Sequence, residues 1–400
     1  MVVTQRALFA DGVTRTTALA YAFLGGMNGA FGAINTELRH ELHLSRTVTG
    51  LHGAMFGWGL LVCALAAQWI VPAMAIDRLF MAAVSAMGVG IAVLALGHHV
   101  VVTMGGAAAY GLGGGVLVLV APQIIAVRHG PNDRTAAFVF INGVSIVGTI
   151  GVPALLALTL GRSWGWRGPM LALALAAAAG TIISARRSGL PPDAAAGEQA
   201  RSPITLLRVV PAVRARWAVL VLGISIEFAA LLWGSATVQD LAHASASTGA
   251  LAIGLFSAGM VLGRFTGPRL VHDRAPEALL RWSFAAALAV SLVVRFGPGL
   301  GGRVAGLFLL GLAIALIYPL AFSRLYGVDG LSASAVGALG ALASGTAVSL
   351  GPAALGALAD GFGLGRALLF IPVMAGTALV LLGRRDVRQR SPAPNPDDVD

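Results

Sequence analysis

Glu227 is the residue whose type and position most clearly require a chemical explanation. The chain has 17 acidic residues, and Glu227 alone lies in the middle of a long apolar run, which starts at Trp217. A carboxylate at the centre of a bilayer costs about 2.5–3.5 kcal/mol on insertion scales, so it needs a compensating role. We expect Glu227 to gain and lose a proton as part of its function. The alternative is a neutral, hydrogen-bonded glutamate in helix packing.

Several polar and aromatic residues within apolar runs are candidates for binding a solute. Asn28 lies at the corresponding depth of the first run, where an amide needs partners. It binds either a solute hydroxyl or carbonyl, or a neighbouring helix. Trp233 and Tyr318 can stack on a ring, although such residues near span ends also anchor helices at the membrane interface. Asn142 and Gln123 are further candidates.

Two more polar residues, His52 and Asn35, lie toward the outer ends of their runs, where we expect them to be solvated. Cys63 is the single cysteine, which excludes a disulfide framework and a cysteine metal site. No metal or cofactor is expected.

The elements that carry these residues are membrane-spanning helices. The chain is 57% hydrophobic and 11% charged, whereas soluble domains are roughly 45–50% apolar and about 25% charged. An ordinary cytosolic enzyme is therefore excluded. We predict an all-α membrane protein, because a span needs about 20 apolar residues. The predicted spans are 17–38, 47–70, 79–97, 101–126, 135–160, 168–185, 217–239, 249–270, 278–296, 303–323, 332–358 and 366–383.

A polar segment divides the chain into two related halves. Residues 186–216 are rich in proline, small residues and arginine, as in a solvated linker. The predicted domains are six-helix bundles at 1–185 and 217–385, with a disordered cytoplasmic tail at 386–400. Landmarks such as Asp77-Arg78 and Asp273-Arg274 recur at a spacing of about 200 residues. Six helices per half make the halves parallel repeats.

The arginines predict the orientation of the chain in the membrane. All 27 basic residues are arginine, and the formal net charge is +10. If both termini are inside, nearly three times as many arginines lie inside as outside, as expected for cytoplasmic loops. The basic balance therefore indicates topology in an inner membrane and argues against binding of nucleic acid.

The layout resembles the major facilitator superfamily over nearly all of residues 15–385. The local pieces that carry the resemblance are Gly263-Arg264 with Arg269, Asp77-Arg78, Gly148, Gly151 and Pro153, and Gly351-Pro352 with Gly356. Within the superfamily, Ile226-Glu227-Phe228, Leu232-Trp233 and Ala359-Asp360 are similar to fucose-permease-like members.

The resemblance implies a monomer in which helices 1, 4, 7 and 10 line a central cavity. It implies gating or structural roles for Asp77, Arg78, Gly263, Arg264, Gly351 and Pro352. We expect Arg264 to pair with an inner carboxylate or a helix end rather than with the solute. The fourth helix lacks the arginine of drug–proton antiporters, and the first and fourth lack the carboxylate of many sugar–proton symporters. Neither coupling scheme transfers directly.

These observations favour a secondary transporter over other classes. Without lysine a P-loop is impossible. A channel needs a polar pore, and an intramembrane enzyme needs partners for Glu227 that the spans lack. We expect apolar cavity walls and no arginine facing the cavity. These features favour proton-coupled efflux of a small neutral or amphipathic organic solute. The alternative is uptake of a sugar or metabolite; a channel or an intramembrane enzyme is disfavoured.

Glycines spaced four residues apart form ridges in three of the predicted spans. They are Gly25 and Gly29, Gly111 and Gly115, and Gly259, Gly263 and Gly267. Such ridges let helix backbones approach closely. We therefore expect tight packing along them, which is compatible with one half rocking against the other.

Overall fold

The computed structural model describes residues 10–129, 131–162, 164–192, 203–273, 275–329, 331 and 333–390. Every regular element in this part of the chain is a helix. The first half contains α2 (Gly12–Glu41), α3 (Arg46–Ala73), α4 (Ile76–Leu96), α5 (Val100–Arg128), α6 (Pro131–Leu160) and α7 (Arg167–Ser188). The second contains α9 (Pro211–Ala242), α10 (Ala246–Asp273), α11 (Pro276–Phe296), α12 (Gly299–Ile314), α13 (Ile317–Tyr326), α14 (Ala333–Phe362), α15 (Leu364–Ala367) and α16 (Phe370–Arg390).

The helices agree with the predicted all-α membrane fold of twelve spans. Within the described residues, 11 segments are long and apolar enough to cross a membrane. Helix α2 is not among them, but it has 30 residues and is buried along most of its length. Helices α12 and α13 together form one span, Gly299–Tyr326. The break between them lies four residues before Pro319, which has no N–H to bond the carbonyl of Ala315.

The boundaries predicted for the two halves differ slightly from the helix ends. A short helix, α8 (Pro203–Val209), lies within the predicted linker, and α9 begins at Pro211, where proline suits the first turn. Helix α16 continues to Arg390, so the first residues of the predicted tail are helical. Residues 391–400 lie outside the described part of the chain. The division into two domains at these boundaries stays a prediction.

The helix ends are set by local capping. The Asp11 carboxylate accepts hydrogen bonds from the Thr14 backbone N–H at 2.9 Å and the Thr14 hydroxyl at 2.7 Å, which starts α2. The turns after α2 and α9 each contain a histidine at positive φ, His43 at 51° and His243 at 52°. Positive φ is uncommon for residues other than glycine. The shared turn geometry supports the repeat read from the sequence.

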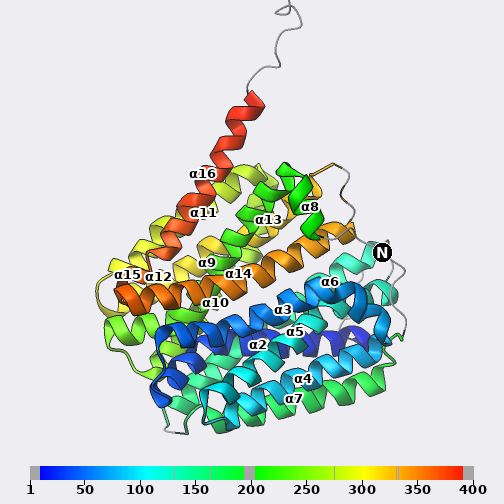
Figure 1. Ribbon diagram of the computed structural model, residues 1–400, viewed down its shortest axis with the longest axis horizontal. Coiled ribbons are helices and arrows are strands. Elements are labelled where there is room, and N and C mark those ends of the chain that lie inside the picture. The colour runs from blue at the N-terminus through cyan, green and yellow to red at the C-terminus, as the bar shows by residue number, and fades with distance from the viewer. Residues whose placement is uncertain are drawn as a thin grey trace, which may run out of the picture.

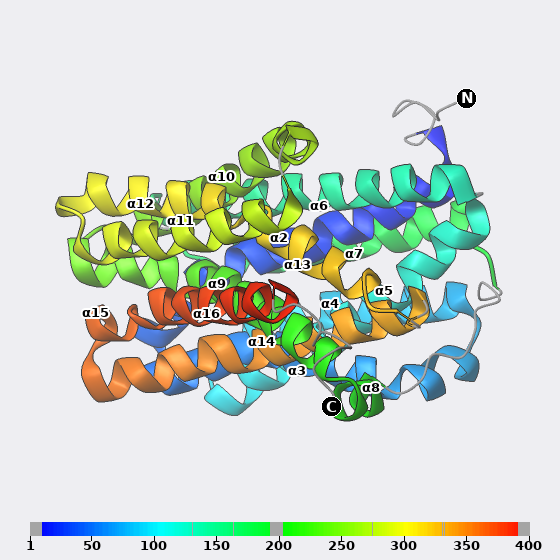
Figure 2. The ribbon, with the colours of Figure 1, turned by 90° about the horizontal axis from the view of Figure 1, so that it is seen from above.

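Figure 1 shows α2–α7 in the lower part of the molecule and α9–α16 in the upper part. The halves meet along α3 against α14, α6 against α10, and α2 against α9. Seen from above, the first two of these pairs lie on opposite sides of α2 and α9 (Figure 2). The turns after α2, α4, α6, α9, α11 and α14 lie at one end of the molecule, called the distal end here. The opposite end, where α2 begins, is called the proximal end.

The glycine ridges pack as the sequence indicates. A Cβ atom at Gly263 would lie 2.5 Å from Ala315 Cβ and 2.9 Å from the Leu312 carbonyl oxygen. Gly111 and Gly115 bring α5 equally close to α3, and Gly25 and Gly29 do the same for α2 and α6. The small residues therefore determine how closely these helices approach within each half.

We predict that Gly263→Ala lowers the free energy of unfolding by about 1–3 kcal/mol, the usual cost of overpacking. The measurement is the thermal unfolding temperature of the purified protein in detergent. Gly180→Ala is the matched control, because a Cβ there meets nothing within 4 Å. Equal unfolding temperatures for the two variants would contradict the close approach of α10 and α12.

Candidate functional site

Glu227 lies on α9, and α2, α10, α13 and α14 all pack against this helix. Its Oε1 atom is 3.9 Å from Nη2 of Arg264 on α10. The Glu227 side chain is 20% exposed and that of Arg264 is 35% exposed. A separation of 3.9 Å is an ion pair but too long for a hydrogen bond. We predicted that Arg264 pairs with an inner carboxylate or a helix end. In the structure its ionic partner is instead Glu227, in the middle of α9.

Tyr318 on α13 is a third polar residue near the Glu227–Arg264 pair. It interacts electrostatically with both Glu227 and Arg264, and its hydroxyl also interacts with the side chain of Ser344 on α14. Tyr21 on α2, in the other half, interacts electrostatically with Tyr318. Glu227, Arg264, Tyr318 and Ser344 are called the polar cluster below. All four residues belong to the second half. The helices that carry Glu227 and Arg264, α9 and α10, pack against α2 and α6 of the first half, so the polar cluster lies on helices of the interface between the halves.

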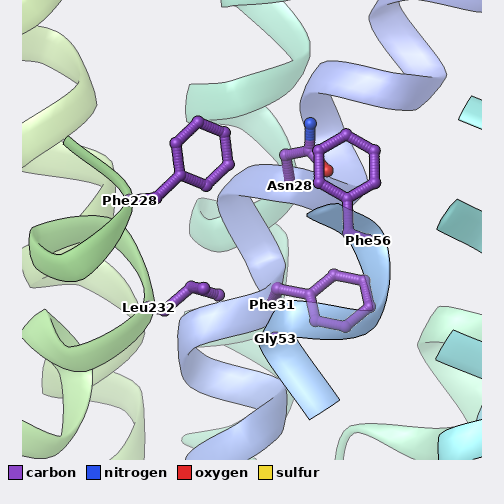
Figure 3. Close-up of a pocket in the computed structure, with 6 residues that line it drawn as sticks. All are labelled: Asn28, Phe31, Gly53, Phe56, Phe228 and Leu232. Carbon is purple, nitrogen blue, oxygen red and sulfur yellow. The ribbon is translucent and has the colours of Figure 1, made fainter. Parts of the chain in front are cut away.

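An aromatic pocket is lined in part by Phe228, the residue that follows Glu227 on α9. It has a volume of about 10 Å³, which is roughly the space for one water molecule. Figure 3 shows Phe228 and Leu232 of α9 facing the residues from α2 and α3. Its lining residues are Asn28, Phe31, Gly53, Phe56, Phe228 and Leu232. The pocket is thus built by both halves, and in this conformation it is closed to a solute.

Asn28 is held in this pocket by a defined hydrogen bond. The hydroxyl of Tyr110 on α5 donates to Asn28 Oδ1 at 2.7 Å. The Tyr110 ring packs against Phe31 and Phe56, with centroid distances of 5.4 and 5.5 Å. Phe56 in turn faces Phe228 across the halves at 6.3 Å. Asn28 therefore has both features that its sequence position allowed: it joins two helices and it lines a pocket.

Asn35 and His52 are buried, so the expectation that they are solvated is wrong. Asn35 is 3% exposed, and its Oδ1 has no hydrogen-bond partner among the described residues. His52 is fully buried, with Nδ1 2.9 Å from the Val48 oxygen and Nε2 2.9 Å from Thr103 Oγ1. Both residues are covered because α2 and α3 pack against other helices up to their distal ends.

The other predicted solute-binding residues lie outside the polar cluster. Trp233 is 2% exposed and donates its indole N–H to the Pro352 carbonyl at 3.1 Å, which connects α9 with α14. The Gln123 amide donates to the Leu119 carbonyl within α5. Asn142 is half-buried on α6. Solute binding by these three residues stays a prediction.

The predicted gating residues occupy packing positions and helix ends. Asp77 lies in the first turn of α4, with Oδ1 buried and unpartnered among the described residues, and Arg78 is exposed. A Cβ at Gly351 would lie 3.2 Å from Ser225 Cβ. Together with the close contacts of Gly263 and the Pro352–Trp233 hydrogen bond, this places three of these residues at helix contacts.

A network of charges joins the two halves at the distal end. Asp240 of α9 binds Arg39 of α2 at 3.1 Å and Arg46 of α3 at 2.9 Å. Asp360 of α14 accepts hydrogen bonds from the backbone N–H groups of Arg46 and Thr47, at 2.8 and 2.7 Å. A carboxylate is favoured at a helix N-terminus. We call these five residues the distal latch.

At the proximal end, comparable contacts stay within one half. Arg128 donates to Asp11 at 2.8 Å within the first half. Arg324 lies 3.8 Å from Glu277 within the second. The distal latch therefore joins the two halves, whereas each of these two proximal ion pairs joins helices of the same half.

The fold and the central polar cluster define a class: an all-α, multi-pass membrane protein with two repeated six-helix halves. The sequence profile described as Major Facilitator Superfamily matches residues 17–341. The chain belongs to this superfamily, as the sequence resemblance predicted. The likeness to fucose-permease-like members stays a prediction.

Relatives and solved structures agree with this assignment. The chain is 29% identical over 164 residues to "Membrane protein MosC" of Rhizobium meliloti, covering 41% of this chain and 40% of that protein. It is 32% identical over 156 residues to "Uncharacterized transporter y4wD" of Sinorhizobium fredii, covering 39% and 41%. The match thus spans about two fifths of the length of these curated relatives.

Two solved structures share the fold. A bacterial homologue of the human lysosomal transporter Spinster, in an inward-facing and unoccupied conformation, superposes with a TM-score of 0.77 at 13% identity. That match covers 96% of this chain and 98% of the other. The nucleoside transporter NupG has a TM-score of 0.75 at 11% identity, with 95% and 99% covered. At these identities the likeness concerns the fold alone.

We predict that Asp240→Asn opens the distal end, because two charge-assisted contacts between the halves are lost. Spin labels are attached to cysteines at the exposed positions Leu96 and Phe362, in a Cys63→Ala background. Pulsed electron paramagnetic resonance then measures the distance between the two halves at the distal end. We expect the longer-distance population to grow roughly tenfold.

Glu277→Gln is the control for this experiment, because it removes a carboxylate that pairs within one half. An unchanged distance distribution in Asp240→Asn would show that the distal latch does not hold this end closed.

Proposed function

We propose that this chain is a secondary transporter that moves a small organic solute by alternating access and couples the movement to protons. The observation that carries the proposal is Glu227, a carboxylate in the middle of a span, 3.9 Å from Arg264 and surrounded by helices of both halves. A titratable group between two halves can exchange its proton with either side as the halves rock.

Alternating access is supported by the distribution of contacts. The distal latch closes one end, and the aromatic pocket is shared by the two halves. Breaking the distal latch while joining the proximal end exposes the same central residues to the opposite side. Rocking of this kind uses the halves as nearly rigid bodies, which the glycine contacts within each half favour.

Other functional classes fit less well. A channel needs a continuous polar pore, whereas the centre here is an aromatic pocket of about 10 Å³. An intramembrane enzyme needs a second acid or a histidine beside Glu227, and within the described residues its charged partner is an arginine. Membership of a transporter superfamily also argues against an enzyme. We propose that the chain acts as a monomer without a cofactor.

The direction of transport has two candidates. Efflux, the preference from the sequence, depends on the apolar walls and stays a prediction. Uptake together with protons is supported by the arginine beside Glu227, because an anionic solute attracted by Arg264 and a proton on Glu227 can move in the same direction. A resemblance in fold to a nucleoside transporter is compatible with either direction.

We predict that Glu227→Gln abolishes proton-driven accumulation of solute but leaves solute exchange across the membrane intact, because the amide cannot bind and release a proton. Proteoliposomes with an imposed pH gradient measure the first property, and counterflow measures the second. Glu227→Asp keeps a titratable group and should retain part of the coupling. Glu277→Gln, at a carboxyl that is 57% exposed, is the matched control. If transport by Glu227→Gln keeps the pH dependence of the parent protein, the proposed role of Glu227 in proton coupling is wrong.

We further propose that both termini face the cytoplasm, because the arginine-rich loops lie at the proximal end. Single cysteines at Arg187 and Gly301, both exposed, lie at the proximal and distal ends. In a Cys63→Ala background, an impermeant thiol reagent added to intact cells should label Gly301→Cys and spare Arg187→Cys. Labelling of Arg187→Cys alone would reverse the topology.

A further inference from the structure

We propose that the solute is an organic carboxylate with an apolar ring, whose carboxylate binds Arg264 and whose ring lies against Phe56 and Phe228. The inference rests on the proton-coupled transport proposed above and specifies its solute. It departs from the neutral or amphipathic solute expected from the sequence, because Arg264 lies beside Glu227 in the middle of the spans.

The first step concerns the hydrogen-bonding capacity of Arg264. A guanidinium has five N–H donors in a planar fork that matches a carboxylate. Within the described residues its charged partner is Glu227, at a distance beyond hydrogen bonding. By contrast, Arg167 donates to Glu41 and to two backbone carbonyls at 2.6 Å. Arg264 therefore keeps donors for a further anion.

The second step concerns where these donors lie. Arg264 is 35% exposed, on a helix that packs against α2, α6, α9 and α12. Its neighbours in the polar cluster come from α9 and α13, with Ser344 of α14 and Tyr21 of α2 beyond Tyr318. The helix that carries the guanidinium thus packs against helices of both halves, which is the location expected of a solute site.

The third step concerns charge. Glu227 is paired with Arg264 of α10, it interacts electrostatically with Tyr318 of α13, and Tyr318 interacts electrostatically with Tyr21 of α2. When Glu227 takes up a proton, the polar cluster changes from neutral to positive in the middle of the spans. Such an unbalanced charge is costly at this depth. An anionic solute restores neutrality, so the proton and the anion each favour binding of the other.

The fourth step concerns the rest of the solute. Phe228 follows Glu227 directly on α9, and its ring lies 6.3 Å from that of Phe56. The two rings belong to different halves and line the aromatic pocket. Separation of the halves would widen this pocket, whose Phe228 directly follows the partner of Arg264 on α9. We therefore propose that a ring joined to a carboxylate by a short link spans from the pocket to Arg264.

The experiment uses three probes that share a ring and differ in the head group: phenylacetate, phenethyl alcohol and phenethylamine. Binding of each to the purified full-length protein in nanodiscs is measured directly, at a mildly acidic and a mildly alkaline pH. We expect phenylacetate to bind, and to bind more tightly at the acidic pH. Failure of phenylacetate to bind, or equal or tighter binding of the alcohol or the amine, would overturn the proposal.

Variants of the charged pair identify the residue responsible. Arg264→Gln should weaken phenylacetate binding roughly 10- to 100-fold, because charge-assisted hydrogen bonds are lost. Arg264→Lys, which keeps the charge but not the fork, should lie between this variant and the parent. Arg15→Gln, at an exposed arginine of α2, is the matched control. Parent-like binding in Arg264→Gln would contradict the assignment.

Glu227→Gln separates this inference from the proposed function. It mimics the protonated residue, so phenylacetate binding should persist and lose its pH dependence. If Glu227→Gln abolishes coupled transport while phenylacetate does not bind, proton coupling stands and the solute class is wrong. If Arg264→Gln fails to fold, the Arg264→Lys series and the comparison of the three head groups still decide between the outcomes.

Discussion

The ion pair between Glu227 and Arg264 is the interaction on which the centre of this molecule depends. A charge of either sign is costly within a membrane, and a pair compensates only if both members stay close. At 3.9 Å the pair is close enough to neutralise its members but not close enough to satisfy their hydrogen bonds. The hydrogen-bonding groups that this pair leaves unused lie on helices at the interface between the two halves, where a transporter binds its solute.

The aromatic pocket and the distal latch are two further places where the halves contact each other. Tyr110 and Asn28 form a rigid wall of the pocket on the first half, and Phe228 faces them from the second. At the distal end, Asp240 and Asp360 hold arginines and a helix N-terminus of the opposite half. Close approach at glycine is not confined to each half, because Gly50, Gly57 and Gly356 also bring α3 and α14 of opposite halves close together. The distal end therefore combines close packing between the halves with the ion pairs of the distal latch.

Some features of this molecule follow from local properties of the chain, and the sequence predicts them. Long apolar runs become helices because a backbone in a membrane has to satisfy its own hydrogen bonds. The landmarks repeated between the halves predict the shared architecture, which His43 and His243 support by their turns. Glycine ridges such as that of Gly263 predict close packing, since nothing larger fits. Glu227 stands out because it is the one acid in mid-span.

The sequence by itself thus determined the spans, the repeat and the single carboxylate at membrane depth. Only the tertiary structure decided the partners: that Arg264 faces Glu227, that Trp233 bonds Pro352, and that Asn35 and His52 are buried. The physical reason is that depth along a helix depends on residue number, whereas the neighbours of a side chain depend on how helices are rotated and packed. Those rotations come from contacts between residues far apart in the chain, such as Ser225 with Gly351, and local sequence patterns do not carry that information.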